Sequence, residues 1–146
     1  MEIEIKLDAS CKNPKIIIVA NQVTEGINDL VSRLSGTAPQ ILVGFRDGRA
    51  EVLEQEKICR VYAAGGKVFA EAENGRYTLR LRLYELEERL NKSHFVRISN
   101  SEIINLKKVK GFDLSLAGTI CVTFCNGEVT YVSRRYVTKI KQVLGI

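Results

Sequence analysis

The sequence predicts a mainly β fold, an all-β body with short helices that follows a small β-β-α unit. Three observations support this class. Short apolar stretches recur at intervals of about 8–12 residues, as in sandwiches and barrels. Asn-Gly and Asp-Gly dipeptides, which favour hairpin turns, separate several of these stretches. The helical patterns are few and do not alternate with the strands, so a doubly wound α/β sheet is not predicted.

The β-β-α unit is predicted over residues 1–36. Residues 2–7 alternate charged with apolar side chains, and this period of two predicts a half-buried strand. Residues 15–20 are β-branched and apolar, which predicts a more buried strand. Apolar side chains in residues 23–34 recur at helical spacing, and Ser35-Gly36 supplies a stop. Two uses of this amphipathic helix stay open: packing on its own sheet, or docking on a partner.

A second domain is predicted over residues 40–146, after a linker at residues 37–40 that contains one of the two prolines. Because strands need turns between them, dipeptides with strong turn preferences locate the hairpins. They are Asp47-Gly48, Gly65-Gly66, Asn74-Gly75 and Asn126-Gly127.

Within this body, residues 77–83 alternate Tyr or Leu with Thr or Arg and predict a two-faced strand. Residues 83–92 place leucines on one side and acids on the other, which predicts a short helix. A terminal helix is predicted over residues 136–144, with Ser133 as its N-cap.

The composition of the 146-residue chain is that of an ordinary globular protein, 45% hydrophobic and 27% charged. No apolar run approaches the ~20 residues of a membrane span, and the N-terminus lacks the features of a signal peptide. We therefore expect a cytoplasmic protein. The four cysteines are scattered and there is one histidine, so we predict no metal site and no cofactor.

Sequence signatures of enzymes are absent. The chain has no G-x-x-x-x-G-K-[ST] motif, no G-x-G-x-x-G after a strand and no G-x-S-x-G elbow. We expect no catalytic residue, no enzymatic activity and no small-molecule substrate. A phospho-acceptor receiver domain is not predicted either, because it needs about 110–120 residues and only about 40 precede the β body.

The net charge of +5 is unevenly distributed. Residues 1–50 are balanced and residues 51–90 carry −1, whereas residues 91–146 combine nine basic with three acidic residues, a net +6. Such asymmetry indicates a nucleic-acid or other anionic partner. A basic face that is merely solvated is the alternative left open.

The stretch HFVRISNSEIINLKKVKGF, residues 94–112, interrupts strand-like sequence with Arg, Ser and Asn. One interpretation is a polar turn between two strands, and the other is a loop that contacts a polyanion. Two uses of Arg97 stay open in the same way: pairing with an acid on its strand, or contacting the polyanion. We expect Asn105 to hydrogen-bond to buried backbone groups rather than to contact the polyanion.

These residues carry a resemblance to a known family. LYELEERLNKSHFVRISNSEIINLKKVKGF, followed by ICVTFCNGEVTYVSRRYVTKIKQVLG, resembles the LytTR family of bacterial DNA-binding domains over about residues 40–146. The elements occur in the family's order at compatible spacings. The matching residues are Leu90, Phe95, Arg97, Ser101, Ile103-Ile104-Asn105, Val109, Asn126-Gly127, Ser133-Arg134 and Lys139-Ile140.

The resemblance implies an elongated β fold that reads the major grooves of duplex DNA with loops, commonly as a homodimer on promoter direct repeats. It places base reading at Ser99-Asn100, a second contact at Arg134-Arg135 and a third at the Gly65-Gly66-Lys67 turn. Receiver-less members often work with a membrane protein that restrains them, so residues 1–36 would serve dimerisation or regulatory docking. The candidate DNA-contact residues are Lys67, Arg97, Ser99, Asn100, Lys107, Lys108, Ser133, Arg134 and Arg135.

The chain also departs from the family pattern. Many members have His followed by Arg or Lys where this chain has Ser99-Asn100, so the expected sequence preference stays open. Glu102 replaces an aromatic residue, and it either faces away from DNA or lowers the affinity. A different function also stays open: a basic interaction module that binds an acidic protein.

Overall fold

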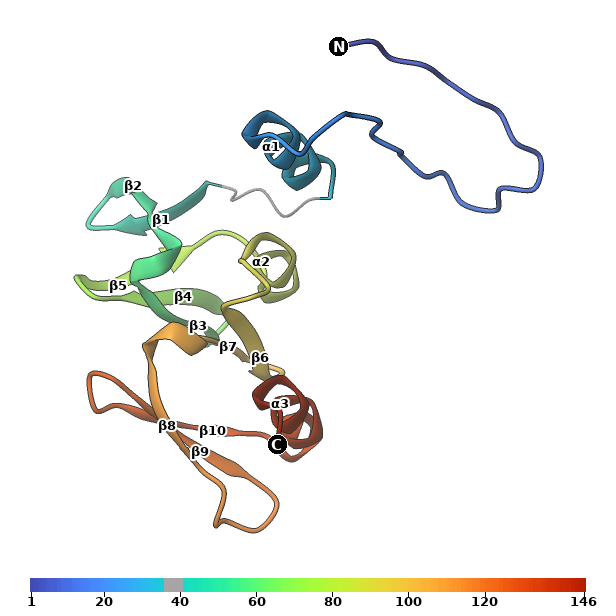
Figure 1. Ribbon diagram of the computed structural model, residues 1–146. Coiled ribbons are helices and arrows are strands. Elements are labelled where there is room, and N and C mark those ends of the chain that lie inside the picture. The colour runs from blue at the N-terminus through green and yellow to red at the C-terminus, as the bar shows by residue number, and fades with distance from the viewer. Residues whose placement is uncertain (36–40) are drawn as a thin grey trace. The chain divides into compact units, whose positions relative to one another are not determined.

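The computed structural model describes residues 1–35 and 41–146 of the chain, which divides into two units, Met1–Ala38 and Pro39–Ile146 (Figure 1). The predicted linker at residues 37–40 lies outside the described residues. Among those described, no helix is both long and apolar enough to span a bilayer.

The helix predicted near the N-terminus is present as α1 (Glu25–Leu34). Thr24 caps it, because its Oγ1 accepts a hydrogen bond from the backbone N–H of Ile27 at 3.3 Å. The two strands predicted before it are wrong for this structure. Residues 2–7 and 15–20 form no sheet, and every residue in them is exposed. Strand-like sequence needs a hydrogen-bonded neighbour, and within the described residues neither segment has one.

The second unit contains two antiparallel sheets, and its β fold is confirmed. The larger sheet has seven strands in the order β2-β1-β5-β4-β3-β7-β6, and the smaller has three in the order β10-β9-β8. The strands are β1 (Leu42–Arg46), β2 (Arg49–Leu53), β3 (Ile58–Ala64), β4 (Lys67–Ala72), β5 (Gly75–Leu79), β6 (Phe95–Ser99), β7 (Glu102–Asn105), β8 (Val109–Asp113), β9 (Ile120–Phe124) and β10 (Val129–Val132).

Short helices connect these strands. They are α2 (Leu83–Arg89), α3 (Val137–Leu144) and the 3₁₀ turns η1 (Gln55–Lys57), η2 (Leu106–Lys108) and η3 (Arg134–Tyr136). The two predicted helices are therefore confirmed, with slightly shorter bounds. Ser133 does not cap α3, contrary to the prediction: η3 lies between them, and the Ser133 hydroxyl makes no capping hydrogen bond. The strand predicted over residues 77–83 ends at Leu79, because Leu83 already opens α2.

The hairpin dipeptides stand where the chain reverses. Asp47 and Gly48 join β1 to β2 with φ angles of 51° and 74°, and Gly127 between β9 and β10 has a φ of 89°. Positive φ angles of this kind are what Asp-Gly and Asn-Gly turns supply at low conformational cost.

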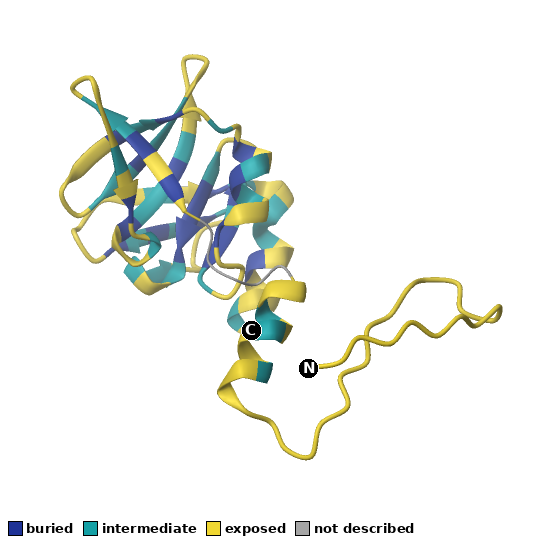
Figure 2. Ribbon diagram, turned by 90° about the horizontal axis from the view of Figure 1, so that it is seen from above, coloured by how far each residue is buried: buried dark blue, intermediate teal, exposed yellow. Residues whose placement is uncertain are grey.

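Two hydrophobic cores lie on opposite faces of β6 and β7, because successive strand residues point to opposite faces. Phe95 and Ile103 join the core under α2, whereas Val96 and Ile104 join the core shared with β8, β9, β10 and α3. Figure 2 shows the buried residues concentrated in the strands and along one side of the helices of this unit. The two strands are therefore anchored on both faces, and they fix the two ends of the turn between them.

Candidate nucleic-acid interface

The turn between β6 and β7 is held by one arginine. The guanidinium of Arg97 donates from Nε to the carbonyl of Ser99 at 3.0 Å and from Nη2 to the carbonyl of Asn100 at 2.6 Å. Its Nη1 pairs with Glu87 on α2 at 2.8 Å. Arg97 shares a strand face with Phe95, which explains why it points toward α2. All three recorded contacts of this guanidinium are internal, so Arg97 positions the turn.

The polar residues of this turn are ordered by short-range hydrogen bonds. Ser99 Oγ accepts from the backbone N–H of Ser101 at 3.1 Å, and the two hydroxyls lie 3.3 Å apart. Asn100 is exposed, and its Oδ1 accepts a hydrogen bond from the Tyr136 hydroxyl at 3.2 Å. Among the described residues the Asn100 Nδ2 group has no recorded hydrogen bond, so its two donors remain available.

The segment before α3 lies directly beside this turn. The backbone N–H of Ser133 donates to the carbonyl of Ile98 at 2.9 Å, and the bond from Tyr136 to Asn100 is a second link. Two regions that are more than 30 residues apart in the chain thus form one surface. The sequence indicated Ser99, Asn100 and residues 133–135 separately, but it gave no signal for the Tyr136 contact.

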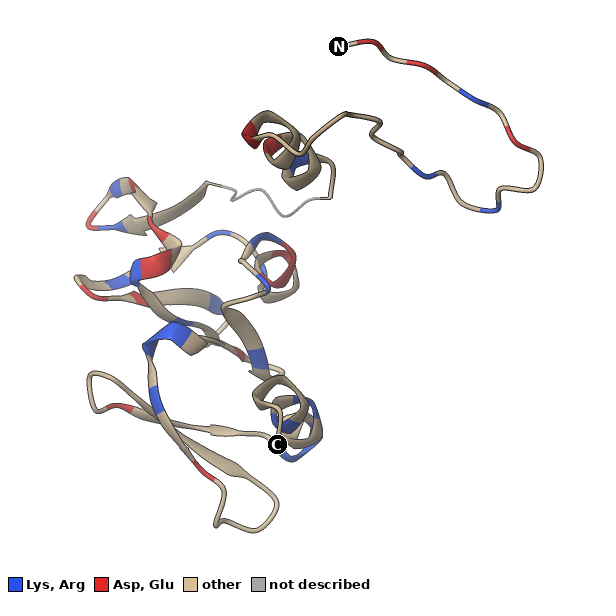
Figure 3. Cartoon of the chain, in the orientation of Figure 1, with Lys and Arg blue, Asp and Glu red and all other residues tan. Residues whose placement is uncertain are grey.

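Two exposed arginines project from this surface. Within the described residues, neither Arg134 nor Arg135 has a recorded hydrogen bond or ion pair. The Arg134 guanidinium lies against Gly118, where a Cβ would stand 3.1 Å from Nη2. Gly118 therefore leaves the room that this guanidinium occupies. Figure 3 shows basic residues gathered along α3 and the turn that precedes it.

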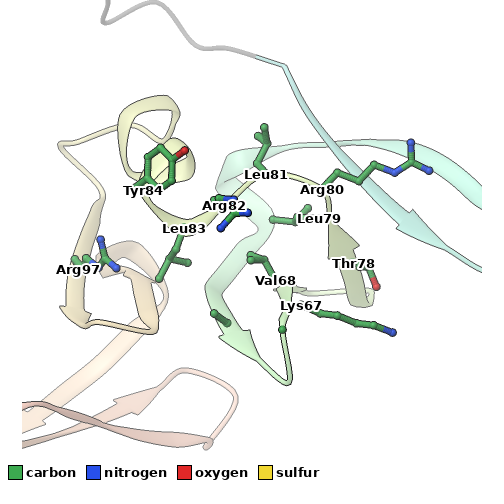
Figure 4. A pocket seen from close by; sticks show the side chains of 12 residues that line it. Lys67, Val68, Thr78, Leu79, Arg80, Leu81, Arg82, Leu83, Tyr84 and Arg97 are labelled. Carbon is green, nitrogen blue, oxygen red and sulfur yellow. The ribbon is translucent and has the colours of Figure 1, made fainter.

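The third predicted contact, the β3–β4 turn with Lys67, is at the same end of the sheet. β3 and β7 are antiparallel neighbours, and the N–H of Ala63 donates to the carbonyl of Ser101 at 2.8 Å. An open cavity of about 610 Å³ lies at this end, lined by Lys67, Arg82 and Arg97 among others. Figure 4 shows Arg97 and Lys67 on either side of Arg82 and Leu83.

Sequence reasoning missed Arg82 as a member of this surface. It is exposed and stands just before α2, beyond the end of β5. The alternation of residues 77–83 indicated that its side chain faces solvent, and that was the available signal. Its neighbour Arg80 is less free, because its guanidinium stacks over the Phe45 ring at 4.1 Å.

Lys107 and Lys108 lie apart from the other candidate DNA-contact residues. They belong to η2, which follows the opposite end of β7 from the turn at Asn100. Lys108 pairs with Glu73, and this hydrogen bond raises the pKa of the lysine and lowers that of the glutamate. Lys107 is exposed. Asn105 is buried and bonds backbone groups, donating to the carbonyl of Ile58 at 2.8 Å.

Glu102 faces away from the turn. Its carboxylate accepts from Thr130 Oγ1 on β10 at 2.9 Å and from Arg60 on β3 at 3.4 Å. Burial raises the pKa of Glu102, and the bonds from Thr130 and Arg60 oppose that shift. Arg60 also pairs with Glu71 at 2.8 Å. The anion that departs from the family pattern therefore links the two sheets instead of facing the exposed arginines.

Three comparisons with known proteins identify relatives of this chain. The family described as LytTr DNA-binding domain matches residues 48–145. An uncharacterized HTH-type transcriptional regulator of Staphylococcus aureus strain NCTC 8325 is 29% identical, over 100% of this chain and 99% of that protein. A regulator of the same description from strain N315 gives the same figures. A solved LytTr DNA-binding domain from Bacillus cereus matches the fold with a TM-score of 0.70 and 24% identity, over 73% of this chain and 97% of that one.

Proposed function

Because the chain belongs to the LytTr family of DNA-binding domains, we propose that it is a transcriptional regulator that binds promoter duplex DNA with sequence specificity. The observation that carries this proposal is the union of two polar regions on one surface. The Asn100 turn and the exposed pair Arg134 and Arg135 are joined through Tyr136. Similarity to a curated regulator over the full chain is consistent with the same role.

Loops rather than a recognition helix would read the bases. The helices α2 and α3 are separated by strands β6 to β10, so they form no consecutive helix pair within the described part. The turns present side chains that can enter a major groove. Asn100 has two amide donors available for base acceptors, and Arg135 has a fork that matches guanine O6 and N7. Each good bidentate contact contributes ~1–3 kcal/mol of discrimination.

The remaining candidates take supporting roles in this proposal. Arg134 and Lys67, with the newly found Arg82, face the phosphates that flank the bases and add salt-dependent affinity. Ser99 and Ser133, at the same turns, contact the sugar-phosphate backbone of the DNA. Arg97 acts through the turn that it positions.

The lysines of η2 contribute differently. Lys107 is exposed and offers a sequence-independent phosphate contact at the other end of β7. Lys108 adds less, because its charge is already offset by Glu73.

The same proposal covers partners and location. The family resemblance supports a homodimer on promoter direct repeats in the bacterial cytoplasm, where promoters are found. It also supports a membrane protein as regulator, with residues 1–36 as the part of the chain available to dimerisation or docking. No small-molecule substrate or cofactor enters this mechanism.

Fluorescence anisotropy tests the proposal. Labelled duplex from upstream of the protein's own gene is compared with a scrambled duplex across a salt series, for wild type, Arg135→Ala and Arg49→Ala. Arg49→Ala is the matched control, because it removes the same charge from an exposed position on the edge strand β2.

We expect selective binding that weakens by ~1–3 kcal/mol in Arg135→Ala and stays unchanged in Arg49→Ala. Weak, equal binding to promoter duplexes and to scrambled DNA, unaltered by Arg135→Ala, would contradict the proposal. That outcome would favour the alternative, a basic module for an acidic protein.

A further inference from the structure

The first 20 residues expose an unusual amount of apolar surface. In a single copy the side chains of Ile3, Ile5 and Leu7 are 90%, 83% and 92% exposed. A second apolar segment follows at residues 15–20. Its exposed large side chains are Ile16, Ile17, Ile18 and Val19. Contiguous exposed apolar surface of this kind marks an interaction site rather than ordinary surface.

The two segments have different patterns that fit different places in one sheet. Residues 2–7 are apolar on one face and charged on the other, as in a strand with one face in solvent. Residues 15–20 are apolar on both faces, as in a central strand of a sheet. The helix α1 has an apolar stripe that could cover one face of the sheet. This stripe is itself uncovered, because Val31 and Leu34 are 47% and 52% exposed and no residue of α1 is buried.

The N-terminal segment is too small to bury these surfaces by itself. The described part of the unit has 35 residues and no sheet, and chains shorter than about 40 residues usually need disulfides, metals or oligomerisation to fold. Its cysteine, Cys11, is free. The segment therefore needs cover from beyond its own residues, and a second copy of the chain supplies a matching segment.

Charge complementarity within the segment favours a second copy as the partner. Residues 2–8 carry three acidic groups and one basic group, whereas residues 12–20 carry Lys12 and Lys15 and no acid. The sequence thus contains both members of a complementary pair. Antiparallel pairing of residues 15–20 with the same residues of a second copy sets Ile17 opposite Ile18 and Lys15 opposite Ala20, so the lysines stay apart.

We propose that residues 1–35 form a two-fold symmetric interface with a second copy of the chain. Residues 15–20 of the two copies pair at its centre, residues 2–7 flank them, and the α1 helices cover one face of the sheet. A two-fold axis requires such a self-complementary surface. This inference deepens the homodimer of the proposed function, and it explains the strand-like sequence of two segments that form no sheet in one copy.

Light scattering and hydrogen exchange on the full chain test the interface without DNA, under reducing conditions because Cys11 is exposed. The disrupting variant combines Ile17→Lys with Ile18→Lys, which places charges at the centre of the proposed pairing. The matched control combines Asn21→Lys with Gln22→Lys, which adds the same charges at exposed polar positions outside both segments. Thermal unfolding of the β unit verifies that its fold is intact in every variant.

We expect wild type and control to have twice the monomer mass from about 1 µM upward, with protected amides in residues 15–20. The disrupting variant should be monomeric and lose that protection. A wild type that stays monomeric up to about 100 µM, or a disrupting variant that remains dimeric, would overturn the proposal. Failure of this dimer proposal is separable from failure of the DNA-binding proposal, because the monomeric variant should still bind a single half-site.

Discussion

Removal of a single hydroxyl tests whether the two polar regions act as one surface. Tyr136→Phe deletes the hydroxyl that donates to Asn100 Oδ1 and leaves the ring in place. The bond is neutral and measures 3.2 Å, longer than the 2.5–3.0 Å usual for O–H···O bonds. Net values for such bonds are about 0.5–1.5 kcal/mol, so an exposed and long example should contribute about 0.5–1 kcal/mol.

The consequence for DNA binding is selective. Without Tyr136 the Asn100 amide loses its fixed orientation, so affinity for the selected promoter duplex should fall about 2- to 5-fold. Affinity for a scrambled duplex should not change, because phosphate contacts are untouched. Anisotropy titrations of both duplexes measure this difference. Tyr131→Phe is the matched control, since Tyr131 is exposed on β10 and has no recorded hydrogen bond among the described residues.

A double-mutant cycle makes the test stricter. If Tyr136 acts through Asn100, then Tyr136→Phe should have no further effect on promoter affinity in an Asn100→Ala background. Additive losses in the cycle, or an equal loss on both duplexes, would refute the argument that Tyr136 orients a base-reading amide.

Three further predictions follow from the contacts around the surface. Arg97→Ala should lower the free energy of unfolding in urea by about 1–3 kcal/mol, because three bonds to a partly buried guanidinium are lost; Arg97→Lys should not restore it, since an ammonium cannot span those acceptors, and full rescue would contradict the positioning role. The pKa of Glu102 is raised in the folded protein, so ionised Glu102 costs stability as pH rises through that pKa. The free energy of unfolding of Glu102→Gln minus that of wild type should therefore be larger at pH 7 than at pH 4. A smaller difference at pH 7 would refute this. Lys108→Ala should leave the salt dependence of DNA binding unchanged, because Glu73 offsets its charge, whereas Lys67→Ala should reduce the slope by about one; a larger reduction for Lys108→Ala than for Lys67→Ala would contradict both assignments.

Local patterns in the sequence predicted much of the second unit. Dipeptides such as Asp47-Gly48 have turn conformations that depend on the residues themselves, so the hairpins were predictable. The leucine pattern of α2 likewise follows from helical periodicity.

The failures arose where contacts beyond the local segment decide the structure. Residues 2–7 and 15–20 have strand-like sequence, but a strand needs a hydrogen-bonded neighbour, and neither segment has one among the described residues. Ser133 has a typical capping side chain, but the intervening 3₁₀ turn moves it away from α3.

Most residues of the candidate surface were named from the sequence, but the contacts that join them were not predictable. The resemblance indicated Ser99, Asn100, Arg134 and Arg135, yet the contact that joins them runs through Tyr136, 36 residues from Asn100. The pairing of Arg97 with α2 also depends on the fold, because only the packing of that helix brings an acid within 2.8 Å. Long-range contacts of this kind leave no periodic signal in a single sequence.

Removal of single acceptor atoms from the DNA tests major-groove reading most directly. Each guanine of the selected promoter duplex is replaced in turn by 7-deazaguanine, which lacks the N7 acceptor, and binding is measured for wild type and Arg135→Ala. We expect at least one guanine whose replacement costs wild type ~1–3 kcal/mol and costs Arg135→Ala nothing further. If every replacement affects both proteins equally, or neither, Arg135 does not read guanine in the major groove.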